Sequence, residues 1–66
     1  MITIIDEKHN DTHWVFYYGN AEEIENGNEK PAKFVVGKAI EENPNGAQTE
    51  TEAIEIMKLN VEGLII

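Results

Sequence analysis

The absence of cysteine from so short a chain is the strongest constraint on its fold. A chain of 66 residues buries only about 60% of the surface that its unfolded form exposes, so its hydrophobic core is thin. Small domains are commonly reinforced by disulfides, a bound metal or a second subunit. Without cysteine, disulfides and cysteine–zinc sites are excluded. The sequence therefore predicts one domain over residues 1–66, stabilised by side-chain packing or self-association.

Charge narrows the class of partner. Thirteen acidic residues and five lysines give a net charge of −8, and arginine is absent. A strongly negative chain is repelled by a nucleic-acid backbone, and bidentate recognition of phosphate or guanine depends on arginine. We therefore expect no direct nucleic-acid binding. A basic protein surface is the expected partner, because complementary charge accelerates association.

The apolar segments are too short for a membrane helix. Residues 1–6 carry no basic stretch followed by a long apolar run, so a signal peptide is not expected. No run approaches the roughly 18 apolar residues that a membrane span requires. We therefore expect a cytoplasmic protein without membrane contact.

The first 18 residues are typical of a β-hairpin. Residues 2–8 and 13–18 are rich in β-branched and aromatic types, which favour strands. The turn formers of "HNDT" lie between them. A two-residue turn would place Ile4 opposite Tyr17, whereas a three-residue turn would slip the register by one. Because a slip of one residue exchanges the two faces of a strand, the sequence leaves the buried aromatic face open.

His9 and His13 flank this turn and raise the question of a metal site. The metalloprotease pattern H-E-x-x-H requires a helix and a glutamate directly after the first histidine. Here Asn10 follows His9, and the surrounding residues favour strands. We therefore expect a polar turn and no bound metal.

The segment 19–31 is predicted to contain a short helix or to form an acidic loop. Asn20 is a good helix cap, and Glu23 places an acid in the first turn. Gly27 is suited to end such a helix in the left-handed conformation. The helix would cover residues 21–26.

The sequence "ENPNG", residues 42–46, predicts a second hairpin. Proline followed by Asn45 and Gly46 suits a type I turn completed by a left-handed glycine. Folding the chain there matches apolar with apolar residues and a cation with an anion. The pairs would be Phe34–Ile56, Val36–Ile54 and Lys38–Glu52. The favoured fold is thus a small β-dominated α+β domain of four antiparallel strands in two hairpins, at about 2–8/13–18 and 33–41/48–58.

The alternative is one hairpin followed by two helices. Residues 32, 35, 36, 39 and 40 follow a helical apolar stripe, and Thr49-x-x-Glu52 is a capping box. Against the first of these helices, Gly37 would lie in its middle. Glu41 and Glu42 would also oppose its dipole. Whether 32–42 and 49–59 are strands or helices stays open, with strands favoured.

Composition argues against catalysis. Serine and cysteine are both absent, so the usual nucleophile–histidine arrangements cannot form. No glycine-rich phosphate loop occurs, and no carboxylate pair stands out among eleven glutamates. We therefore expect neither an enzyme nor a cofactor.

These exclusions favour a small acidic interaction protein, an inhibitor or adaptor that docks on a basic surface of a larger protein. In the sharpest form of this hypothesis, its carboxylates imitate a nucleic-acid backbone. The candidate binding residues are Glu22, Glu23, Glu25, Glu41, Glu42, Glu50 and Glu52.

Both ends of the sequence are apolar, which suggests a second role. Met1–Ile5 and Leu64–Ile66 are prone to form strands, whereas free ends are usually polar and frayed. We expect these ends to contribute to a weak homodimer. The alternative function is accordingly a self-associating structural or assembly protein.

Overall fold

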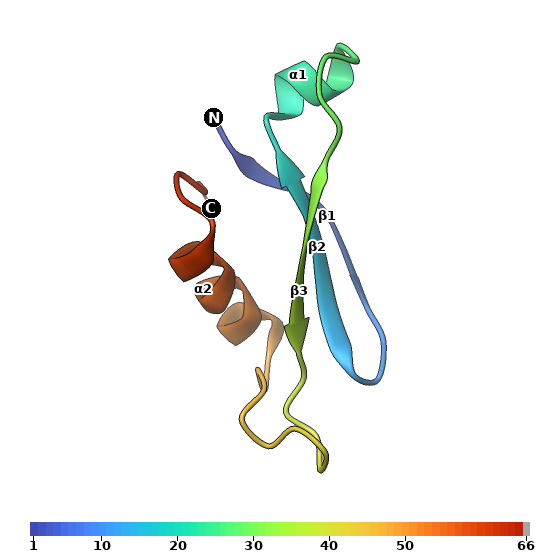
Figure 1. Ribbon diagram of the computed structural model, residues 1–66, viewed down its shortest axis with the longest axis vertical. Helices are drawn as coiled ribbons and strands as arrows, with labels where there is room; N and C mark the ends of the chain where they lie inside the picture. Colours follow the sequence, from blue (N-terminus) through green and yellow to red (C-terminus); the bar gives the residue numbers. More distant parts are fainter. Residues whose placement is uncertain (66) are drawn as a thin grey trace.

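The computed structural model describes residues 1–65 and contains a three-stranded antiparallel sheet with one helix on it (Figure 1). The strands follow one another in the order β1-β2-β3. Helix α2 lies along one side of the sheet, while α1 lies at one end of the molecule. The elements are β1 Thr3–His9, β2 His13–Gly19, α1 Ala21–Glu25, β3 Ala32–Gly37 and α2 Glu50–Asn60.

The first hairpin is confirmed, but neither predicted register is right at its turn. His9 pairs with Trp14, because a longer loop joins the strands. The side chain of Asn10 closes this loop: its Oδ1 accepts hydrogen bonds from the backbone N–H groups of Thr12 and His13, both at 2.9 Å. A bulge between Ile4 and residue 6 then shifts the pairing farther along β1.

This register decides which aromatic face is buried. Phe16 is fully buried in the core under α2, with Trp14 and Tyr18 packed beside it. Val15 and Tyr17 alternate with them and therefore point to the opposite face. The aromatic-rich face of β2 is the core face.

The short helix α1 is confirmed. Its cap is Asn20, whose Oδ1 accepts the N–H of Glu23 at 3.2 Å. The chain leaves the helix through Gly27, which has the expected left-handed φ of 78°. Local capping chemistry indicated this helix, and the acidic loop that the sequence also allowed at these positions does not form.

The prediction of four strands in two hairpins is wrong. Strand β3 exists, but it pairs with β2, and Phe34 lies opposite Phe16. Residues 50–60 form a helix, so the expected pairing of 33–41 with 48–58 does not occur. Val36 is instead buried in the core, and Phe34 is partly buried and packs against it.

Helix α2 follows the signals that supported the alternative fold. Thr49 caps it by accepting the N–H of Glu52 at 3.2 Å, and the Glu52 carboxylate accepts the N–H of Gln48 at 2.9 Å. Ala53 and Met57, one turn apart, are both fully buried. The alternative is nevertheless wrong for its first helix, because residues 32–37 form β3.

The turn predicted in "ENPNG" closes a local loop between β3 and α2. Ile40 and Asn43 exchange backbone hydrogen bonds, and Gly46 donates to the carbonyl of Asn43 at 3.0 Å. Lys38 then forms an isolated parallel β-bridge with Ala47. Gly46 does not have a positive φ, so the expected left-handed glycine is also wrong.

The core is small and draws on every layer of the fold. Its buried residues come from the sheet, from α2 and from the segments on either side of α2. They are Phe16, Val36, Ala47, Ala53, Met57 and Val61. The two chain ends meet beside it. Ile2 forms a parallel bridge with Leu64, and Ile65 donates its N–H to the carbonyl of Ile2 at 2.8 Å.

Candidate functional site

The predicted acidic residues are divided between the two ends of an elongated molecule. Three lie on α1, whereas the others lie in the loop after β3 and at the start of α2 (Figure 1). The longest dimension of the molecule is 42 Å. The structure therefore does not join the first three, Glu22, Glu23 and Glu25, to Glu41, Glu42, Glu50 and Glu52 in one continuous surface.

The two histidines are engaged in different contacts. The ring of His9 stacks on Trp14 with centroids 5.2 Å apart, and its Nδ1 lies 3.0 Å from Lys38 Nζ. The same lysine lies 4.3 Å from the Trp14 ring. His13 Nδ1 lies 2.7 Å from Thr12 Oγ1. Residues 1–65 contain no group of three or more histidine, aspartate or glutamate side chains that could hold a metal.

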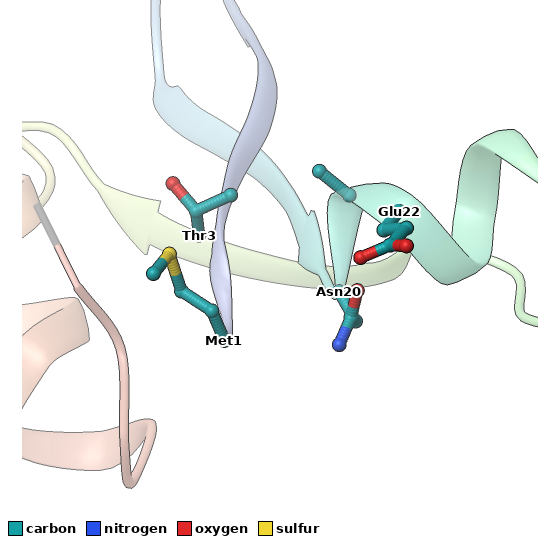
Figure 2. Close-up of a pocket in the computed structure, with 5 residues that line it drawn as sticks. Met1, Thr3, Asn20 and Glu22 are labelled. Atoms are coloured by element: carbon teal, nitrogen blue, oxygen red, sulfur yellow. The ribbon is translucent and has the colours of Figure 1, made fainter.

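A hollow of about 260 Å³ lies between the chain start and the beginning of α1 (Figure 2). Its lining is Met1, Thr3, Asn20, Ala21 and Glu22. The side chains around it supply one carboxylate, one hydroxyl and one amide. The amide oxygen already caps α1. Figure 2 shows the Thr3 hydroxyl pointing away from the Glu22 carboxylate, so the two do not form a nucleophile–base pair here.

Glu7 carries a buried oxygen that lacks a hydrogen-bond partner among the described residues. Glu7 of β1 pairs with Phe16 of β2, so its side chain lies on the side of the sheet that α2 covers. Its Oε1 is buried without a partner. An unpaired buried acceptor costs about 1–3 kcal/mol, so this carboxylate opposes folding.

We expect Glu7→Met to raise the free energy of unfolding by about 1 kcal/mol, because the variant removes the unpaired oxygen and keeps the chain length. Urea denaturation, followed by the fluorescence of Trp14, measures the change. Glu7→Gln is the matched control: it keeps a polar atom in the same place and should change stability by less than about 0.5 kcal/mol. A destabilised Glu7→Met would contradict the expectation.

The outer face of α2 carries a stripe of acidic and apolar residues. Their spacing of i, i+3, i+4 and i+7 places them on one helical face, opposite the buried Ala53 and Met57. Leu59 is 88% exposed and Ile56 is 37% exposed. We call this set the α2 stripe: Glu52, Glu55, Ile56 and Leu59, all exposed.

The side of the sheet away from α2 is a second surface. Within residues 1–65 no helix or strand covers it (Figure 1). Its centre is apolar, and lysines and one aspartate flank the centre. We call it the open face: Asp6, Lys8, Val15, Tyr17, Lys33 and Val35.

The sequence predicted only some of the residues on these two surfaces. Glu52 was among the predicted residues, but Ile56 was assigned to a strand core opposite Phe34. The helical period alone could have placed Leu59 opposite Ala53. The open face required knowledge that β3 pairs with β2, and no local signal carries that information.

Comparison with protein-family models, with curated proteins and with solved structures finds no match for this chain. Among the described residues, none of the helices has the length and apolar character needed to cross a membrane.

Proposed function

We propose that this chain is a small non-catalytic interaction protein that docks on a basic surface of a larger protein through the α2 stripe. It would act as an inhibitor or adaptor by covering that surface. The proposal extends the expectation from net charge and gives it a location on the molecule.

The observation that supports it is the exposure of Leu59. An 88% exposed leucine on a well-capped helix contributes almost nothing to the core of its own chain. Ile56 lies one turn before it, and Glu52 and Glu55 border the pair. Interfaces commonly combine a few apolar anchors with a polar rim. The stripe has this composition.

The chemistry of the stripe defines its partner. An apolar groove would receive Leu59 and Ile56, and lysine or arginine side chains at its edge would pair with the glutamates. Helix-in-groove recognition uses side chains at this i, i+3, i+4 spacing. Imitation of a nucleic-acid backbone is supported less well, because the predicted carboxylates lie at both ends of a 42 Å molecule.

Affinity capture with the immobilised chain tests the proposal. We expect a basic protein to be retained at low salt and released as salt rises, because added salt shortens the range of attraction between exposed charges, which is about 8 Å at physiological ionic strength. Leu59→Ser should weaken retention at least about tenfold, since loss of a central anchor costs about 2 kcal/mol or more. Its high exposure means that the substitution leaves the fold intact.

Two charge variants complete the design. Glu55→Lys reverses a charge within the stripe and should reduce retention, whereas Glu25→Lys makes the same change on α1 and should not. Equal retention by Leu59→Ser and the unaltered chain would refute the proposed surface. Capture of acidic proteins only would refute the proposed partner.

A further inference from the structure

We infer that the open face is the interface of a symmetric homodimer, in which two sheets pack face to face. This inference is independent of the proposed function, because the open face and the α2 stripe lie on opposite sides of the sheet. It also differs from the expectation of a dimer through the chain ends, where Ile2 and Leu64 already pair within one chain.

The open face has an ordered pattern of charge and apolar side chains. One row across the three strands is Asp6, Tyr17 and Lys33, with opposite charges at its two edges. The next row is Lys8, Val15 and Val35. The residues of a row lie on the same face of an antiparallel sheet, and alternate residues along a strand share that face.

This pattern is complementary to itself. A twofold axis parallel to β2 places β1 of one copy over β3 of the other. Asp6 then lies over Lys33 of the second copy, and the axis forms this pair twice. Tyr17 meets Tyr17 of the second copy at the centre, and the aliphatic stem of Lys8 covers Val35 of the second copy. Sheets packed in this aligned way lie about 10 Å apart, a distance that lysine and aspartate side chains bridge together.

The distribution of charge favours a second copy as the occupant. Of the thirteen acidic residues, the open face carries only Asp6, together with two of the five lysines. Most of the other acids lie on α1, in the loop after β3 and on α2, outside the six residues of the open face. Repulsion between two copies is therefore weakest along this seam, since screening removes most of it beyond about 8 Å.

The apolar centre of the open face favours its burial against a second copy. Val35 is 47% exposed, and Val15 and Tyr17 are half-buried by their neighbours in the sheet alone. The face has two residues on each of three strands. With a strand spacing of about 4.8 Å and a rise of about 3.3 Å per residue, its area is roughly 200 Å². Stable interfaces cover about 800 Å² per partner. The dimer should therefore be weak, with a dissociation constant on the order of 100 μM.

Sedimentation equilibrium of the purified chain, up to about 1 mM, tests this inference. We expect a monomer–dimer equilibrium. Asp6→Lys and Lys33→Asp should each weaken association about tenfold or more, because each creates two like-charge contacts across the axis. The double variant Asp6→Lys/Lys33→Asp exchanges the partners, so it should restore association. A chain that stays monomeric throughout, or a double variant no better than the single ones, would overturn the inference.

Matched controls separate this interface from general charge effects and from the chain ends. Glu62→Lys raises the net charge by the same two units as Asp6→Lys, but away from the open face, and should not weaken the dimer. Asp6 also accepts the N–H of Glu7 at 2.9 Å, a bond that Lys33→Asp leaves intact. Ile65→Ser alters an end residue that is 52% exposed and should leave the dimer unchanged. If Ile65→Ser abolishes association while the charge variants do not, the ends form the interface and the inference fails.

Discussion

Phe16→Ala is expected to abolish the cooperative unfolding transition of this protein. Phe16 is fully buried and is one of the two largest buried side chains, with β3 on one side and α2 over it. Replacing a buried phenylalanine by alanine costs about 3–5 kcal/mol. A domain of 66 residues is stable by only about 3–10 kcal/mol in total, so the loss is comparable to the whole.

Thermal and urea denaturation, followed by circular dichroism and by the fluorescence of Trp14, measure this effect. Val35→Ala on the adjacent strand is the control, because its side chain lies on the open face and is 47% exposed. We expect the control to lose less than about 1 kcal/mol. A sharp transition near that of the unaltered chain in Phe16→Ala would contradict the described core.

Gly46→Ala is expected to lower the free energy of unfolding by about 3 kcal/mol. A Cβ atom at this position would clash with the backbone carbonyl group of Lys38 and lie 2.7 Å from the backbone nitrogen of Ala39. Backbone atoms cannot move aside as a flexible side chain can. The loop would have to open at the hydrogen bond between the N–H of Ala39 and the carbonyl of Ala47.

Asn45→Ala is the control for this loop, because Asn45 is exposed and adjacent to Gly46. We expect it to change stability by no more than about 0.5 kcal/mol. Amide hydrogen exchange at Ala39 and Ala47 adds a local measurement: protection at both should fall in Gly46→Ala. Unchanged protection and stability would show that the chain does not approach itself closely here.

The surfaces proposed for function depend on tertiary structure to different degrees. The α2 stripe is a local feature, because four residues on one helix define it and the helical period can be read along the chain. The open face joins residues from three strands, so its pattern exists only once Tyr17 lies between Asp6 and Lys33. Net charge predicted an interaction protein, but the fold decides which surfaces carry the acidic side chains and which carry the lysines.

The sequence alone marked the boundaries of elements that have local chemistry, although it did not decide whether residues 49–59 form a strand or a helix. Asn20 and Gly27 delimit α1, Thr49 and Glu52 begin α2, and the turn formers after His9 join the first two strands. In each of these, side chains bond to backbone groups only a few residues away, so the information lies within a short window.

Tertiary structure decided the pairing of β3 and the role of residues 50–60. The segment 33–37 matches both β2 and a strand at 50–56 in hydrophobic pattern, and pattern alone does not rank the two partners. On the aromatic face of β2, Phe16 pairs with Phe34 and Trp14 pairs with Val36. Once that pairing forms, the sheet exposes an apolar face that an amphipathic helix can cover, and α2 covers it with Ala53 and Met57. Burial of the common core thus selected one strand and one helix where local sequence allowed either.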